Sequence, residues 1–132
     1  MATGDVFNVV IPMVNGGTTS AVGTTKYLAF FAPTTAVGGG VTITKWGVTS
    51  GSAVGSGSAP AFSLITTTSA GVVNGTVGAS GSVSYTAGTP VAGTVSTAFV
   101  TQGYGVMLRL EQDQVCPQTL FLNGYVQYVM GK

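Results

Sequence analysis

Residues 120–132 read LFLNGYVQYVMGK and form the most strand-like stretch of the chain. Tyr125, Val126, Tyr128 and Val129 are aromatic or β-branched, types that are enriched in strands, and the apolar character continues to Met130. Chain ends fray unless tertiary contacts hold them in place. We therefore expect this stretch to lie inside a sheet or against a neighbouring subunit.

The dipeptide Asn123-Gly124 leaves two interpretations of this stretch open. Asn-Gly is the strongest short signal for a β-hairpin, and a hairpin here would leave a short first arm after Pro117. The alternative is one long strand, Thr119–Met130, that carries a glycine bulge. We favour the long strand and keep the hairpin as the alternative.

The rest of the chain also favours strands over helices. The 132 residues include 21 Gly, Gly or Pro interrupts almost every ten-residue window, and Thr and Val dominate between the interruptions. The clearest alternation is VMLRLE at 106–111, in which Val106, Leu108 and Leu110 share one face while Met107, Arg109 and Glu111 share the other. This pattern is typical of a half-buried strand.

Together these features predict an all-β chain with negligible helix. We expect residues 1–132 to form a single-domain β-sandwich of jelly-roll type with eight or nine short strands. The linker-like SGSAVGSGSAP at 50–60 is interpreted as a surface loop, because neither half of the chain would hold an adequate core alone. The predicted strands are Val6–Val14, Lys26–Ala32, Val41–Val48, Ala61–Thr68, Ser82–Thr86, Thr94–Thr101, Gly105–Gln112 and Thr119–Met130, with Val72–Val77 as a weaker ninth.

The N-terminal segment 1–14 begins polar and becomes apolar from Val6 to Val14. It contains Pro12, which is poorly placed in a central strand because proline cannot donate to the ladder. We expect this segment to be an arm or an edge strand.

Charge and hydropathy exclude several classes of partner. Charged residues make up 5% of the chain, its net charge is +1, and its four cations are scattered, so we expect no nucleic-acid binding. No apolar run approaches the ~20 residues that span a bilayer, so no membrane partner is expected. The start MATGDVFNVV lacks the features of a signal peptide. Synthesis in a cytoplasm is expected, and a lone Cys116 fits a reducing compartment.

Catalytic, metal and cofactor sites are not expected. Histidine is absent, which removes the commonest general base and metal ligand, and one cysteine cannot build a zinc site of the usual kind. Glu111 and Asp113 would share a face of an extended chain, but no third acidic residue lies nearby in the sequence. They are interpreted as a solvated strand end. The chain is not expected to be an enzyme.

The aromatic residues have two possible uses. A jelly roll needs large side chains between its sheets, so core packing is expected for the phenylalanines. Trp46 and Tyr104 remain open between the core and an exposed platform for a sugar or another ligand.

A surface of Ser, Thr and Gly with little charge suits a subunit that neighbours cover, since interface cores are poor in charge and rich in aromatic residues and Met. The expected interface residues are Val6, Phe7, Val9, Val10, Ile11, Met107, Tyr125, Tyr128 and Met130.

The start MATGDVFNVVIP, the Gly/Thr/Ser/Ala-rich middle, and the paired segments GYGVMLRLEQDQ and LFLNGYVQYVMGK, above all the ending YVMGK, resemble small all-β virion proteins of tailed bacteriophages. The resemblance is to capsid decoration and head auxiliary proteins. It implies a homo-oligomer, most often a trimer, that binds the major capsid protein, stabilises the outside of the capsid and has no catalytic residues. The protein would be made in the host bacterial cytoplasm and located in the virion. The alternative function is a receptor- or carbohydrate-binding β-sandwich module of a phage fibre or spike.

Overall fold

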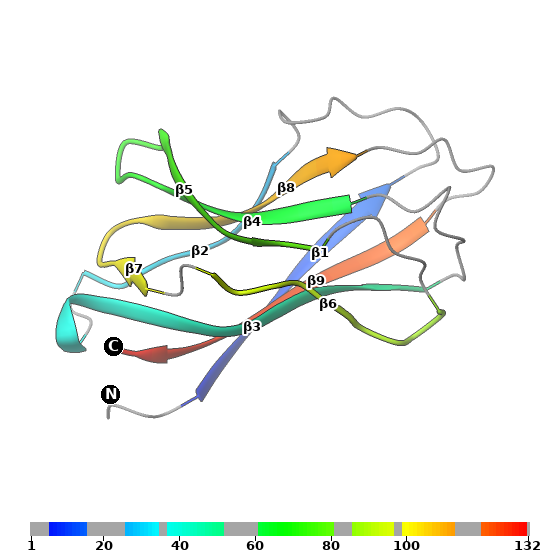
Figure 1. Ribbon diagram of the computed structural model, residues 1–132, viewed down its shortest axis with the longest axis horizontal. Helices are drawn as coiled ribbons and strands as arrows, with labels where there is room; N and C mark the ends of the chain where they lie inside the picture. The colour runs from blue at the N-terminus through cyan, green and yellow to red at the C-terminus, as the bar shows by residue number, and fades with distance from the viewer. Residues whose placement is uncertain are drawn as a thin grey trace.

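The computed structural model describes residues 6–15, 26–34, 37–51, 61–80, 86–96, 99–112 and 120–131. They form two antiparallel sheets that pack face to face around one core (Figure 1). The five-stranded sheet has the order β1-β9-β3-β6, with β7 also paired to β3, and the four-stranded sheet has the order β2-β8-β4-β5. The helical content of the described residues is one short 3-10 turn, η1 (Val37–Gly39). The prediction of an all-β sandwich is confirmed.

Most strands begin and end near the residues that the sequence indicates. The structure has β1 (Val6–Asn15), β2 (Lys26–Phe31), β3 (Gly40–Ser50), β4 (Ala61–Thr67), β5 (Val73–Ala79), β6 (Val91–Ala92), β7 (Phe99–Thr101), β8 (Gly105–Gln112) and β9 (Leu120–Met130).

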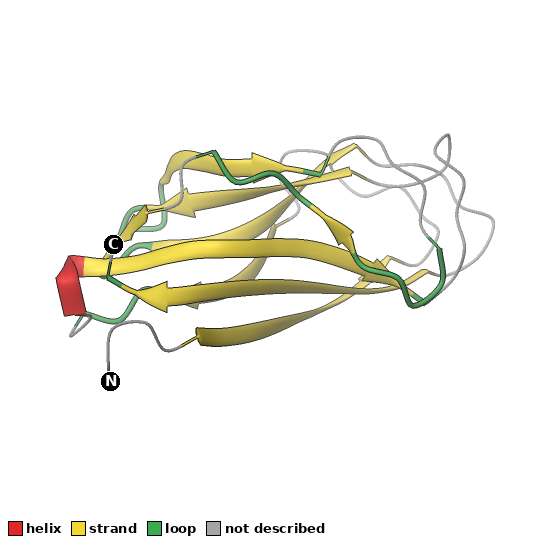
Figure 2. Ribbon diagram, turned by 60° about the horizontal axis from the view of Figure 1, so that its bottom comes forward, coloured by secondary structure: helices red, strands yellow, loops and turns green. Residues whose placement is uncertain are grey.

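Strand β9 is one long strand at the centre of the five-stranded sheet. It pairs with β1 on one side and β3 on the other, and Figure 2 shows these three long strands side by side with β1 outermost. The interpretation as a single strand is therefore confirmed over the hairpin. The expected glycine bulge is wrong, because pairing runs without interruption through Asn123 and Gly124 on both sides. The register shift lies in β3 instead, between Ile43 and Lys45.

Gly124 is required by the packing between the sheets. A Cβ at this position would lie 2.3 Å from Leu108 Cδ1 of β8 and 3.4 Å from Ile11 of β1. Leu108 is completely buried, so it occupies the space that any larger residue at 124 would need. A glycine inside a strand here marks a close approach rather than a turn.

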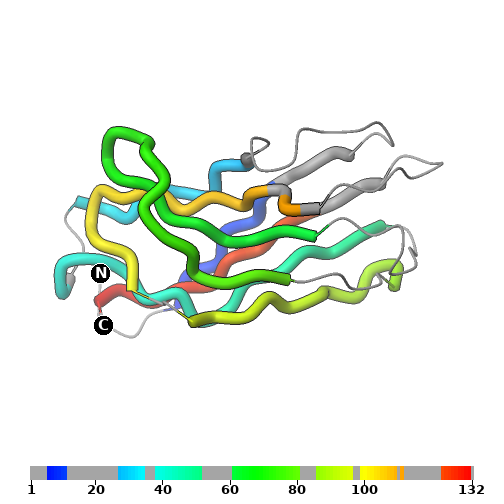
Figure 3. Tube along the Cα trace, turned by 45° about the horizontal axis from the view of Figure 1, so that its top comes forward, coloured from blue at the N-terminus to red at the C-terminus, as the bar shows by residue number. Residues whose placement is uncertain are grey.

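The segment between β5 and β8 differs most from the expected strands. The predicted strand Thr94–Thr101 is wrong over its first three residues, because residues 94–96 are not in a strand, whereas Phe99–Thr101 form β7. The N–H groups of Thr94 and Ser96 donate to the carbonyls of Ala79 (3.0 Å) and Val77 (2.7 Å) in β5. The segment thus runs alongside β3 and crosses to β5, closing this side of the sandwich (Figure 3).

Two further predictions concern the same region. The pair Val91–Ala92 forms β6 in a segment that reads as a turn, AGTPVAG at 87–93. The predicted strand Ser82–Thr86 lies outside the described residues except for Thr86, which is not in a strand.

The core lies between the sheets and is centred on large side chains from β3, β8 and β9. Trp46 is 0% exposed, and its Nε1–H donates to the carbonyl of Thr94 at 2.7 Å. A Cβ at Gly93 would lie 2.1 Å from the indole ring. Residues 93–96, which we call the crossing segment, therefore pack directly on Trp46. The bond satisfies the one polar atom of a buried tryptophan.

Candidate interaction surfaces

The outer face of the five-stranded sheet carries exposed valines from its edge strand. In β1, residues alternate so that Val6, Asn8 and Val10 face outward, and Val10 is 66% exposed. Val6 lies opposite Val129, and Val10 lies opposite Tyr125. We call these four residues, Val6, Val10, Tyr125 and Val129, the valine face.

A polar band crosses the middle of the valine face. Gln127 Nε2 donates to Asn8 Oδ1 at 3.1 Å. The hydroxyl of Thr44 contacts both the carbonyl and the side-chain oxygen of Gln127, at 3.1 and 3.2 Å. These bonds place polar side chains between the pair Val6 and Val129 and the pair Val10 and Tyr125.

Several residues expected at an interface belong instead to the protein's own core. Ile11 and Met130 are almost completely buried in the central cluster, and Phe7, Val9 and Tyr128 are half-buried and pack against it. Their expected interface role is therefore wrong for Ile11 and Met130, because the alternation of β1 and β9 turns these side chains inward. An interface role for Val6, Val10, Tyr125 and Met107 stays a prediction.

Three aromatic rings link the sheets on the inner side of β1 and β9. Tyr128 stacks on Phe7 of the neighbouring strand, with ring centroids 5.4 Å apart, and on Phe30 of the opposite sheet at 4.5 Å. Burial raises the pKa of the Tyr128 phenol. This stack ties the edge strands β1 and β2 to the core.

The outer face of the four-stranded sheet carries an apolar patch, of which the sequence analysis identified Met107 but not the other two residues. We define the apolar patch as Leu28, Phe31 and Met107. Leu28 and Phe31 of β2 are each 50% exposed, and Leu28 lies opposite Met107 of β8. The register shift between Leu28 and Phe30 brings Phe31 to the same face as Leu28. The available signal was YLAFF at 27–31, a run with apolar residues on both faces.

Beneath the apolar patch lies a buried hydroxyl that has no hydrogen-bond partner among the described residues. Thr67 of β4 is 1% exposed, and among the described residues its Oγ1 has no hydrogen-bond partner. A Cβ at Gly105 would lie 2.6 Å from this oxygen and 3.1 Å from the Phe31 ring. The ring and the hydroxyl therefore lie together over Gly105, where the missing side chain leaves them room. An unsatisfied buried hydroxyl costs about 1–3 kcal/mol.

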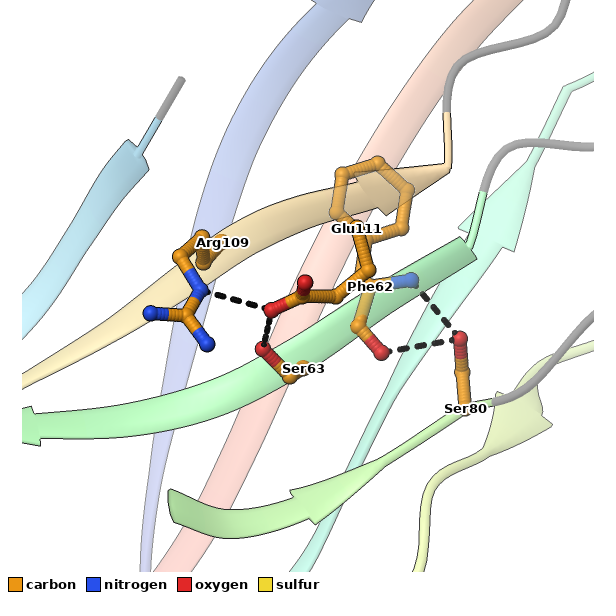
Figure 4. Close-up of polar contacts among 5 residues, drawn as sticks. All are labelled: Phe62, Ser63, Ser80, Arg109 and Glu111. Carbon is orange, nitrogen blue, oxygen red and sulfur yellow. Dashed lines mark hydrogen bonds and ion pairs between the residues drawn. The ribbon is translucent and has the colours of Figure 1, made fainter. Parts of the chain in front are cut away.

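A charged cluster lies beside the apolar patch on β8 (Figure 4). Glu111 Oε1 accepts from Arg109 Nε at 2.6 Å and from Ser63 Oγ of β4 at 2.5 Å. Burial by itself would raise the pKa of Glu111, but the bond from Ser63 and the bond and charge of Arg109 together lower it. Glu111 is thus held as a carboxylate by its neighbours. Asp113 lies outside the described residues.

Nearby, Ser80 extends the pairing of β4 beyond the end of β5 (Figure 4). Its hydroxyl accepts from the N–H of Phe62 at 2.9 Å and donates to the carbonyl of Phe62 at 3.1 Å. Both backbone groups of Phe62 are therefore satisfied at the sheet edge.

Of the two alternatives left open for Trp46 and Tyr104, core packing is the one observed. Trp46 lies in the core with no exposed surface, so its interpretation as a platform residue is wrong. Tyr104 is half-buried and packs against the same core.

In the part of the chain that the structure describes, no group of three or more His, Cys, Asp or Glu side chains is placed to hold a metal ion. No helix among the described residues is long and apolar enough to cross a membrane.

Comparison with known proteins gives a similarity of fold. No protein-family model matches the sequence, and no curated protein sequence does. Among solved structures, the chain is similar to one in "Cyanophage Pam1 capsid asymmetric unit", with a TM-score of 0.57 and 12% identity. The alignment covers 98% of this chain and 87% of the other chain. The two chains therefore share a fold over almost the whole length of this chain.

Proposed function

We propose that this protein is a non-enzymatic structural component of a bacteriophage virion, which binds the major capsid protein and stabilises the outside of the capsid. It would act there as a homo-oligomer, with a trimer as the expected state. The fold it shares with a chain from a cyanophage capsid structure supports a role of this class.

The strand order supports a jelly roll. The described strands pair as β1–β9, β2–β8, β3 with β6 and β7, and β4–β5. This nested order is the one that a single long antiparallel ribbon adopts when it is rolled into two sheets. Strands β6 and β7 share one position, because both pair with β3.

The observation that carries the proposal is the exposed apolar patch on the outer face of the four-stranded sheet. Leu28 and Phe31 are large and half exposed. A protein that covers the patch would remove apolar surface from water, worth about 25 cal/mol per Å². A chain with 5% charged residues also gains solubility from such cover.

The carbohydrate- or receptor-binding alternative has no comparable support. Trp46, one of the two candidate residues for a ligand platform, lies in the core. The exposed aromatic side chain of the apolar patch, Phe31, has no hydrogen-bonding atom for a sugar.

The test is binding to phage particles that lack this protein, measured by co-sedimentation. Phe31→Ser should weaken binding at least tenfold, because it removes the exposed ring while leaving the core intact. The matched control is Val95→Ser, at a 37% exposed valine in the crossing segment on the other side of the sandwich, which should bind like the parent. Unchanged binding by Phe31→Ser would contradict the proposal, and Trp46 fluorescence checks that both variants are folded.

A further inference from the structure

Strand β1 presents a long, regular and uncharged sheet edge. It is ten residues long, it pairs with β9 in continuous register, and its sequence VFNVVIPMVN contains no charged residue. Among the described residues, no backbone hydrogen bond joins β1 to any strand other than β9. Such an edge is a template for pairing with another strand, and proteins usually protect against it.

The other edges are protected. Strand β5 carries two register shifts, and its free side is bonded by Thr94 and Ser96. Strands β6 and β7 have only two and three residues. Strand β2 has six residues and a register shift between Leu28 and Phe30. Bulges, short length and proline are standard protection for an edge strand. Strand β1 is long and has no bulge, and its one proline, Pro12, lies beyond the stretch Val6–Val10.

The register identifies the backbone groups that face outward from β1. The carbonyl of Gln127 and the N–H of Gly131 bond toward β3, so the even-numbered residues of β9 bond toward β1. Their partners Phe7, Val9 and Ile11 are the odd-numbered residues of β1. The N–H and C=O groups of Val6, Asn8 and Val10 therefore point to the open edge. Pro12 belongs to the same outward set, where its missing N–H disturbs no bond to β9.

We propose that this edge pairs antiparallel with β1 of a second copy of the chain, about a two-fold axis at Asn8. In this register Asn8 faces Asn8 of the second copy, and Val6 faces Val10. Each facing pair exchanges two backbone hydrogen bonds, and Pro12 lies outside the paired residues. The two five-stranded sheets become one continuous sheet across the contact.

A second copy suits this edge because the edge is complementary to itself. A two-fold axis brings each residue against its own counterpart or a symmetric neighbour. In β1 that places no like charges together, because Val6–Asn15 has none. The outward side chains of Val6 and Val10 are exposed and meet each other across the seam as β-branched pairs, which favour sheet pairing.

This contact is separate from the apolar patch and does not depend on a phage particle. A two-fold contact involves two copies of the chain only. The same contact would therefore also join two larger oligomers that assemble through a different surface.

Cross-linking tests the register. Residues that face each other in a hydrogen-bonded pair have Cα atoms about 5.5 Å apart, within the range of about 4.4–6.8 Å for a disulfide. In a Cys116→Ser background, Asn8→Cys with copper phenanthroline as oxidant should give a covalent dimer in high yield. Val72→Cys, exposed in the turn between β4 and β5, is the control and should give little. Equal yields from both positions would overturn the two-fold register.

Charge exchange tests the pairing without covalent chemistry. Asn8→Lys and Asn8→Asp each place like charges together at the axis, so each variant alone should dimerise at least tenfold more weakly than the parent. A mixture of the two should restore a one-to-one dimer by light scattering and native mass spectrometry. A parent that stays monomeric up to about 1 mM, or a mixture that does not recover, would overturn the proposal. Phe31→Ser should leave this dimer unchanged, which separates it from capsid binding.

Discussion

Tyr128 of β9 stacks on Phe30 of β2 with ring centroids 4.5 Å apart and ring planes at 20°, so one aromatic contact joins the two sheets near their open side. The opposite side is closed differently, by backbone bonds from Thr94 and Ser96 to β5. Backbone hydrogen bonds therefore connect the two sheets on one side of the sandwich, and aromatic side-chain packing connects them on the other.

Tyr128→Ala should lower the free energy of unfolding by about 2–3 kcal/mol, because it removes a half-buried ring that contacts Phe7 and Phe30. Tyr128→Phe keeps the stack and should cost less than about 1 kcal/mol. Denaturant midpoints followed by Trp46 fluorescence measure both changes. Val10→Ala, at an exposed position, is the control and should stay within about 0.5 kcal/mol. Equal midpoints for all three variants would mean that the stack contributes nothing.

Gly124→Ala should destabilise the fold by about 1–3 kcal/mol, because the new methyl would lie 2.3 Å from Leu108 Cδ1. Leu108→Ala removes a buried leucine and should cost about 2–5 kcal/mol. The double variant should lose less than the sum of the two, since shortening Leu108 makes room for the methyl. Strict additivity in this cycle would show that the two sites do not meet.

Ending the chain at Gly124 should abolish folding or assembly rather than trim a flexible end. Residues 125–130 are half-buried or buried and pair with both β1 and β3. Their loss leaves the partner strands with unpaired backbone groups in the middle of the sheet. It also removes two side chains of the hydrophobic core, Val126 and Met130. Circular dichroism and light scattering should show an unfolded or aggregated product. A truncated protein as stable as the parent would contradict the central position of β9.

Stability should fall in acid partly through Glu111. Its pKa is lower in the folded protein than its ordinary value of 4.5, so its interactions stabilise the fold above that pH and are lost as the pH falls through the folded-state value. Because the pair with Arg109 is partly exposed, we expect a contribution of about 0.3–1 kcal/mol. Glu111→Gln should be less stable than the parent at pH 7, and the difference should shrink at pH 3. Parallel pH profiles of the two proteins would contradict this.

The strands themselves could be predicted from the sequence where one face is buried. In β8 the alternation places Val106 and Leu108 in the core and Met107 and Arg109 outside, because side chains of a regular strand alternate between two faces. The long strand β9 could be predicted from its aromatic and β-branched content. Its sequence left open whether it lies inside a sheet or against a neighbouring subunit, and the pairing with both β1 and β3 places it inside the sheet.

Register shifts explain where the prediction failed. In β3, plain alternation from Ile43 would point Lys45 inward and Trp46 outward, but the shift at Thr44 reverses this and buries Trp46. In β2, the shift at Ala29 brings Leu28 and Phe31 to one exposed face. Bulges depend on the partner strand, so the sequence of one strand does not reveal which face its aromatic residues take.

The central position of β9 also decides when the protein can fold during synthesis. Strand β1 is synthesised before the other described strands, yet its ladder partner in the sheet is β9, and most of β3 also pairs with β9. The five-stranded sheet therefore cannot form until Met130 has emerged. Contacts between such distant segments make folding slow and leave strand edges open in the meantime. Nascent and prematurely terminated chains would thus remain open to proteases and chaperones, and only chains synthesised through β9 would reach a state fit for assembly.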